Sequence, residues 1–197
     1  MVETFYPVSS IYPCIRDTGT LAGVAMTSVC LIETYDEMML SYEGMMTGAR
    51  IAEHVREYAP SWVFVTGCEP TTHDLSELMI NLMASKFSIA LETDGSIYQD
   101  CMKCMDWITV SPKMQRSFED IDSLVVGLAH EIKFVIPSVG DLSKAFDFVK
   151  RFHINPAYTI CLQPADMSAE LINLCYNAVI TMGWRLAVPL NRLIAVN

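Results

Sequence analysis

The segment SWVFVTGCEP, residues 61–70, predicts the fold more directly than any other stretch of the chain. Its first half, WVFV at 62–65, is a short apolar run of β-branched and aromatic residues, which is typical of a buried strand. Its second half, TGCEP at 66–70, replaces these with a glycine, a thiol, an acid and a proline. Parallel α/β folds place ligand-binding groups beyond the carboxyl ends of their strands, so this ending predicts a parallel sheet and part of a site.

Apolar runs of strand length alternate with segments of helical period through the rest of the chain. Strands are predicted at 24–32, 62–65, 88–93, 107–111, 131–136, 159–164 and 185–188. Helices are predicted at 47–58, 72–86, 141–153 and 168–182, whereas 96–106 and 112–130 show neither period clearly. Seven strands with fewer helices predict an α/β fold with a mostly parallel sheet, an incomplete βα barrel, in a single domain over residues 1–197.

The charge balance argues against two classes of partner. The formal net charge is −10 and only 13 residues are Lys or Arg, whereas a nucleic-acid partner requires a basic surface. No apolar run reaches membrane-spanning length, and the first 25 residues lack the pattern of a signal peptide. Seven cysteines, an odd number, favour reduced thiols over a disulfide framework. We therefore expect a cytoplasmic protein that binds neither nucleic acid nor membrane.

Four predicted strands end in residues that suit contact with a ligand. TGCEP follows the strand at 62–65, and the other three endings read ETDG at 92–95, SPK at 111–113 and QP at 163–164. Each motif alone is typical of a turn. Because the carboxyl ends of parallel strands share one edge of a sheet, four such endings in order predict a site for a small polar molecule.

These endings resemble those of the radical SAM superfamily, and specifically of the 7-carboxy-7-deazaguanine synthase family of queuosine biosynthesis. That family reads GGEP, ETNGT, TVSPK, LKFVV, LQP and WRLSVQ-x-HK, where this chain has TGCEP, LETDGS, ITVSPK, EIKFVI, CLQP and GWRLAVPLNR. The resemblance runs from about residue 19 to the end and implies the partial barrel of radical SAM enzymes. It also implies that S-adenosylmethionine (SAM) would meet Gly67, Cys68 and Glu69 at its amino group. Its ribose, its carboxylate or the neighbouring substrate would meet Glu92, Thr93, Ser111, Lys113 and Gln163.

The family motif that holds a 4Fe-4S cluster, CxxxCxxC, has no counterpart in this sequence. The corresponding loop reads VCLIETYDEMMLSYEG at 29–44, and the three ligand positions fall near Thr34, Met38 and Ser41. No two cysteines in the chain are separated by four positions. Three thiolates hold such a cluster and leave its fourth iron open. The cluster is therefore predicted absent. The family's QGEG and terminal HK also change, to RDTG at 16–19 and to Asn191-Arg192.

Other metal sites are weaker alternatives. Cys101 and Cys104 form a CxxC pair that could be half of a zinc or cluster site, but two thiols on a short helical turn is the favoured interpretation. A cluster could combine this pair with Cys30 and Cys68, although clusters normally take their ligands from one loop. The run MMLSYEGMM at 38–46 could bind Cu(I), but methionine-rich stretches more often form adaptable apolar surfaces. No metal site is predicted.

The leading hypothesis is a pseudoenzyme of this family, without catalytic residues, that serves as a binding or scaffold subunit. Its contact surface would include Met38, Met39, Met45 and Met46, and its partner would be another protein or a second copy of the chain. Two alternatives keep the site at the strand ends: a SAM-binding enzyme of 7-deazapurine (queuosine) biosynthesis, and a sensor of a small nucleotide.

Overall fold

The computed structural model describes residues 3–32, 44–155 and 158–193. Thr34, Met38, Met39 and Ser41 lie outside these ranges. The chain divides into two compact units, of which the first contains Met1–Ile15, Ala25–Thr93 and Ile97–Ile108. The second contains Arg16–Val24, Asp94–Ser96 and Thr109–Asn197. The single domain expected from the sequence stays a prediction.

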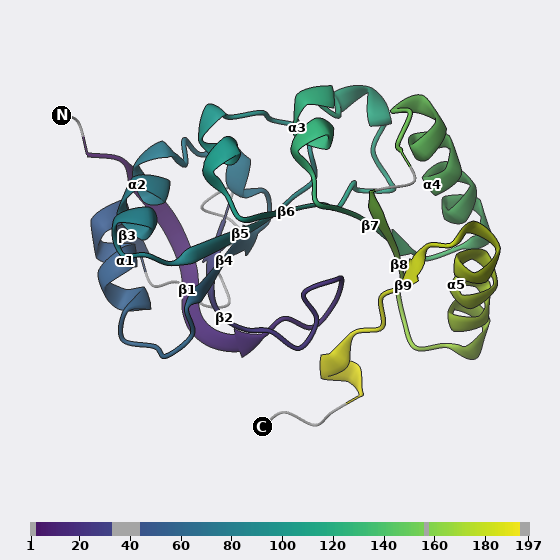
Figure 1. Cartoon of the computed structure of the whole chain (residues 1–197), viewed down its shortest axis with the longest axis horizontal. Coiled ribbons are helices and arrows are strands. Elements are labelled where there is room, and N and C mark those ends of the chain that lie inside the picture. The colour runs from purple at the N-terminus through teal and green to yellow at the C-terminus, as the bar shows by residue number, and fades with distance from the viewer. Residues whose placement is uncertain (1–2, 33–43, 156–157, 194–197) are drawn as a thin grey trace. The chain divides into compact units, whose positions relative to one another are not determined.

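The first unit contains a five-stranded sheet with two helices beside it (Figure 1). The strand order is β3-β1-β2-β4-β5, in which β3, β1 and β2 are antiparallel and β2, β4 and β5 are parallel. The strands are β1 (Phe5–Ile15), β2 (Ala25–Leu31), β3 (Gly44–Thr47), β4 (Trp62–Gly67) and β5 (Ser88–Thr93), and the helices are α1 (Gly48–Val55) and α2 (Ser76–Ala84).

The second unit continues the βα pattern with parallel strands only. Its strand order is β6-β7-β8-β9, and its helices α4 and α5 pack against β7 and β8 respectively (Figure 1). The strands are β6 (Trp107–Val110), of which only Thr109 and Val110 belong to this unit, β7 (Glu131–Ile136), β8 (Thr159–Pro164) and β9 (Arg185–Leu186). The helices are α3 (Ser123–Leu128), α4 (Val139–Arg151) and α5 (Ala169–Met182). Ser138 and Ser168 cap the starts of α4 and α5 with their hydroxyl oxygens.

The prediction of a mostly parallel, open α/β sheet is confirmed, because the strand order has two ends and the sheet does not close. The sequence-based assignment failed to find β1 and β3, since β1 contains Pro7 and Pro13 and does not alternate regularly. Helix α2 begins at Ser76 and not at 72, because Pro70–Thr72 form a 3-10 turn. The predicted strand at 185–188 is only two residues long, and the unassigned segment 112–130 contains α3.

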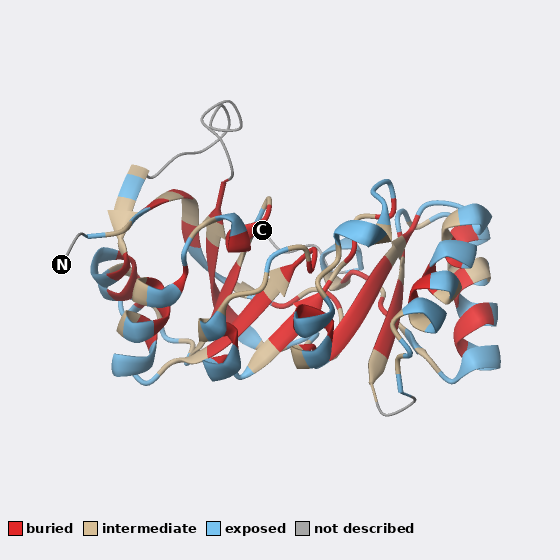
Figure 2. Cartoon of the chain, turned by 90° about the horizontal axis from the view of Figure 1, so that it is seen from above, coloured by how far each residue is buried: buried red, intermediate tan, exposed pale blue. Residues whose placement is uncertain are grey.

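Each unit has its own apolar core, formed by the inner strands and one face of each helix (Figure 2). In β4, Val63 and Val65 are fully buried, and in β7 Phe134 is fully buried beside Phe148 of α4. Strands β5, β7 and β8 each contain several buried apolar residues within six positions. This explains why the sequence located them to the residue.

Gly67, the last residue of β4, lies opposite Leu31 at the end of β2, where the two backbones come very close together. Its backbone φ is +135°, and an added Cβ would lie 1.8 Å from the carbonyl oxygen of Leu31. That same carbonyl accepts a hydrogen bond of 3.1 Å from the N–H of Cys68. Only glycine can occupy this position without moving backbone on one of the two strands.

We expect Gly67→Ala to lower the free energy of unfolding by about 3 kcal/mol, because it adds both a backbone clash and a disfavoured φ. Gly44→Ala is the matched control, since Gly44 has a φ of +117° but nothing within 4 Å of an added Cβ. The control should lose about 1 kcal/mol, the conformational term alone. Urea unfolding of both variants measures the difference, and equal losses would contradict the steric explanation.

Candidate functional site

In the first unit, the predicted site residues of β4 and β5 are brought together by Glu69. The Glu69 side chain is buried, and its Oε1 accepts hydrogen bonds from the Thr71 backbone N–H (3.1 Å), the Thr71 hydroxyl (2.7 Å) and the Thr93 hydroxyl (2.7 Å). Thr93, itself buried, is the last residue of β5. The carboxylate therefore joins the ends of two parallel strands through donors of the chain itself.

The residues near Glu69 at this edge of the sheet differ in how far they are exposed. Gly67 is exposed, whereas Cys68 and Glu92 are half-buried. Cys68 stands where the family motif has its second glycine, and its backbone N–H is already bonded to Leu31. Thus Gly67 and Glu69 have structural roles, and Glu92 is the charged side chain of this edge that remains partly exposed.

The segment that follows TGCEP is held by one side chain, Gln99. Its Oε1 accepts a hydrogen bond from the Leu75 N–H (2.9 Å), and its Nε2 donates to the carbonyls of Thr71 (2.8 Å) and His73 (2.6 Å). The His73 ring also lies 2.9 Å, through its Nε2, from the carbonyl oxygen of Ile32. These contacts fix the connection between β4 and α2. No local sequence pattern indicates the role of Gln99, because 24 or more residues separate it from its partners.

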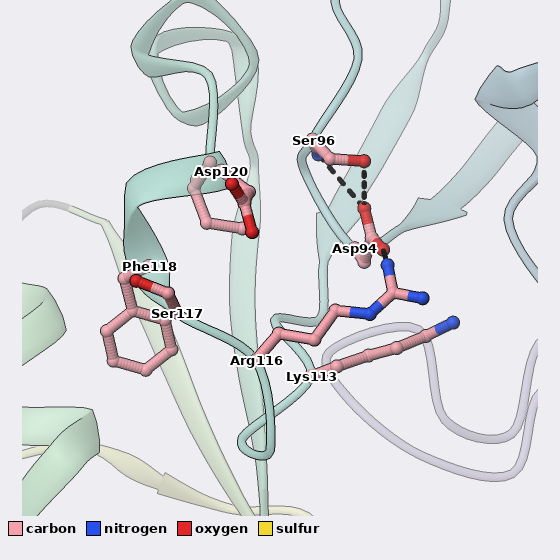
Figure 3. Close-up of a pocket in the computed structure, with 8 residues that line it drawn as sticks. Asp94, Ser96, Lys113, Arg116, Ser117, Phe118 and Asp120 are labelled. Carbon is pink, nitrogen blue, oxygen red and sulfur yellow. Dashed lines mark hydrogen bonds and ion pairs between the residues drawn. The ribbon is translucent and has the colours of Figure 1, made fainter.

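In the second unit, Ser111 and Lys113 follow β6, and Lys113 lines a shallow pocket (Figure 3). Its enclosed volume is about 10 Å³, room for one water-sized group. Lys113 and Arg116 belong to one turn, in which the Arg116 N–H donates to the Lys113 carbonyl (2.9 Å). The pocket is lined by Asp94, Ser96, Lys113, Arg116, Ser117, Phe118, Asp120 and Ile121.

Asp94 orders this pocket. Its side chain is 4% exposed, and its Oδ1 accepts hydrogen bonds from the N–H (3.0 Å) and the hydroxyl (2.6 Å) of Ser96. Its Oδ2 forms an ion pair of 3.2 Å with Arg116 (Figure 3). Asp94 stands where the family motif ETNGT has asparagine, so the carboxylate that holds Arg116 is a change from the family pattern. The sequence motifs include Lys113 and Asp94 but not Arg116, because no motif links positions 22 residues apart.

Gln163 in β8 is a predicted site residue whose polar group lacks a partner. Its Oε1 is buried and accepts no hydrogen bond from any residue that the structure describes. Buried polar atoms are nearly always hydrogen-bonded, to protein or to an ordered molecule. This oxygen is therefore a group that can accept a hydrogen bond from a ligand or a water.

A buried carboxylate, Glu131 of β7, holds the segment 16–24 in the second unit. It accepts a hydrogen bond from the Thr20 N–H, and its oxygens lie where an added Cβ of Gly19 would come, 2.3 Å from the nearer one. On the same strand, buried Lys133 donates to the Thr18 hydroxyl (3.3 Å). The retained glycine of the altered RDTG motif is thus explained by packing against Glu131.

Burial, together with the same carboxylate, makes the nearby Cys161 thiol unreactive. The thiol donates to Glu131 (3.4 Å), and burial, reinforced by the negative charge of Glu131, raises the pKa of Cys161 to about 12. A thiol with so high a pKa forms little thiolate, which is the form that binds metals and attacks disulfides. Cys161 is therefore a structural residue.

The residues that the structure describes contain no group of three His, Cys, Asp or Glu side chains placed to hold a metal ion. Cys101 and Cys104 lie on a 3-10 turn, Asp100–Cys104, as the favoured interpretation of their spacing predicts. Within residues 3–32, 44–155 and 158–193, no helix has the length and apolarity needed to cross a bilayer.

Comparison with known proteins defines first the class of fold. The crystal structure of QueE from Escherichia coli matches with a TM-score of 0.81 over 93% of each chain, at 22% sequence identity. The chain therefore has the open, mostly parallel α/β fold of that protein. No family model matches the chain.

The sequence comparison then identifies the family. The chain is 30% identical over its whole length to the 7-carboxy-7-deazaguanine synthase of Synechocystis sp., of which the match covers 96%. It is also 30% identical over 136 residues to the Escherichia coli (strain K12) protein of that name, in a match that spans 68% of this chain and 60% of the relative. The chain belongs to the 7-carboxy-7-deazaguanine synthase family.

Proposed function

We propose that this family member does not perform radical chemistry and serves as a binding or scaffold subunit in a protein complex. The observation that carries the proposal is the set of donor groups at the three cluster-ligand positions. Thr34, Met38 and Ser41 offer two hydroxyls and a thioether, whereas iron–sulfur clusters are held by thiolates. The residues present at these positions therefore do not fit the cluster.

The retained motifs support this proposal, because several of them have partners inside the chain. Gly67 lies against the Leu31 carbonyl, and Glu69 Oε1 accepts three hydrogen bonds from Thr71 and Thr93. Loss of a buried acceptor with several donors typically costs about 1–3 kcal/mol for each unsatisfied group. Folding stability alone is a sufficient reason for a chain to keep these residues after a change of function.

The proposed contact surface consists of residues 38–46, MMLSYEGMM, of which 44–46 belong to β3. In β3, Met45 is 50% exposed and pairs in register with Pro7 of β1. Strand β3 stands at the end of the strand order, so among the described strands it is bonded only to β1. An exposed edge strand with flexible apolar side chains suits addition of a partner's strand.

Iron and sulfide analysis after anaerobic reconstitution tests the first half of the proposal. We expect no stoichiometric iron, because the chain has no set of three thiolates in one loop. About four irons and four sulfides per chain, with the charge-transfer absorption of a cluster, would overturn it. The same analysis of a variant in which all seven cysteines are serine identifies iron that is bound non-specifically.

Serine in place of Met38, Met39, Met45 and Met46 tests the contact surface. We expect the variant to keep its circular dichroism spectrum and to weaken association at least about tenfold, which corresponds to about 1.4 kcal/mol. Sedimentation equilibrium measures association with a second copy, and affinity capture with quantitative mass spectrometry measures association with other proteins. Met83→Ser is the control, since Met83 is 47% exposed on α2 and outside the surface. Equal association of all three proteins would sink the proposal.

A second candidate function is binding of SAM, or of a related small nucleoside, at the positions that the resemblance assigns to it. The specific observation is Gln163, whose buried Oε1 lacks a hydrogen-bond partner among the described residues. Such an atom costs about 1–3 kcal/mol, and a chain that had lost every ligand would gain stability by replacing it. Lys113 and Arg116 lie on one turn of the same unit and suit a carboxylate.

Calorimetric titration with SAM, and separately with S-adenosylhomocysteine, tests this candidate. If the site persists, we expect saturable heat that is weakened at least about tenfold in Glu92→Ala, Lys113→Ala and Gln163→Leu. Glu170→Ala and Lys150→Ala, which remove exposed charges on α5 and α4, should not change it. In the absence of ligand, Gln163→Leu should raise the free energy of unfolding by about 1 kcal/mol, because it removes an unsatisfied acceptor. No heat with either compound would rule out the second candidate and leave the first unaffected.

A further inference from the structure

The CxxC pair, Cys101 and Cys104, lies within a single 3-10 turn, Asp100–Cys104. In a 3-10 helix, side chains at positions i and i+3 eclipse each other, and a rise of about 2 Å per residue places their Cα atoms about 6 Å apart. Disulfides connect Cα atoms that are about 4.4–6.8 Å apart. The backbone therefore already holds these two cysteines at bridging distance.

The two thiols differ in exposure. Cys104 is exposed, whereas Cys101 is half-buried and donates a hydrogen bond of 3.5 Å to Gln99 Oε1. Burial raises the pKa of Cys101, and the negative charge of a nearby Cys104 thiolate would raise it further. An accessible thiol beside a shielded one corresponds to the attacking and resolving thiols of a reversible dithiol site.

The turn itself is fixed on both sides of the pair. On the exposed side, Asp100 Oδ1 accepts from Lys103 Nζ (2.8 Å) and from the Tyr98 hydroxyl (2.8 Å). On the buried side, Gln99 is bonded to Thr71, His73 and Leu75. These contacts support the 3-10 turn, so the short backbone separation of the two cysteines belongs to the folded chain.

We propose that Cys101 and Cys104 form a reversible disulfide by exchange with a low-molecular-weight disulfide. The Cys104 thiolate, whose proton passes to water, attacks one sulfur of the small disulfide and breaks its S–S bond. The released thiolate takes a proton from water and leaves as a thiol. Cys101 then loses its proton to water and attacks the Cys104 sulfur, which expels the second small thiol. Two protein thiols are oxidised and one small disulfide is reduced to two thiols, so atoms and electrons balance.

The disulfide changes a contact that orders the connection after β4. In this structure Gln99 Oε1 accepts hydrogen bonds from the Leu75 N–H and from the Cys101 S–H. Oxidised Cys101 has no S–H, so only the hydrogen bond from Leu75 remains. Gln99 is the side chain that fixes residues 71–75, directly after the TGCEP segment. The oxidation state of the pair therefore acts on the edge formed by β4 and β5, whether or not that edge binds a ligand.

Incubation of the full chain with oxidised glutathione, followed by digestion with trypsin without reduction, tests the proposal. Trypsin cuts after Lys103, between the two cysteines, and gives the peptides 87–103 and 104–113, each with one cysteine. We expect mass spectrometry to find these two peptides joined by a disulfide. The yield should be at least about tenfold higher from folded chain than from chain in 8 M urea, because the fold raises the effective concentration of one thiol near the other.

Single variants separate this pair from the other thiols. Cys104→Ser should leave Cys101 unmodified, whereas Cys101→Ser should trap glutathione on Cys104. Cys14→Ser, which changes another half-buried thiol of the first unit, should still give the joined peptides in full yield. Glutathione that remains on Cys104 of the unsubstituted chain, or equal yields of joined peptides in buffer and in urea, would overturn the proposal.

Discussion

The close approach of the Leu31 carbonyl to Gly67 is the constraint on which the first unit depends. It sets the register of the parallel pair β2 and β4, in which Leu31 lies opposite Gly67, and it supplies the acceptor for the Cys68 N–H. It also decides which glycine of the family's GGEP motif must stay. The position of Gly67 excludes any side chain, whereas the next position holds the half-buried side chain of Cys68. One motif residue is therefore required by the backbone, and its neighbour is free to change.

The second unit shows the same division at the segment 16–24. Gly19 is retained because the Glu131 carboxylate occupies the space of a Cβ, and Thr18 accepts a hydrogen bond from Lys133. These contacts lie within the chain and need no ligand. Asp94 is the opposite case, since it departs from the family's asparagine and forms an ion pair with Arg116. At Gly19, the residue that matches the family motif packs against an internal carboxylate, and at Asp94 the residue that differs from the motif forms an internal ion pair.

The parts of the fold that the sequence predicted are those whose determinants are local. Strands β5, β7 and β8 are short runs rich in apolar residues, and α4 carries apolar residues at helical spacing, so periodicity located them. Strand β1 was not predicted, because it contains two prolines and is stabilised by its pairing with β2 and β3. The contacts of Gln99, Glu131 and Asp94 join residues 22 to 111 positions apart. No local pattern encodes such contacts, so the motifs named the edge of the site but not the side chains that order it.

Internal hydrogen bonding separates the candidate residues into two kinds. Glu69 and Thr93 satisfy each other inside the first unit, so their presence gives little information about a ligand. Gln163 differs, because its buried Oε1 has no hydrogen-bond partner among the described residues and can accept a hydrogen bond from a ligand or a water. A residue that stabilises the fold persists for that reason alone, whereas a residue that destabilises it requires another explanation. The argument for a surviving small-molecule site therefore rests on Gln163, and the argument for a changed function rests on the donor groups of the altered loop.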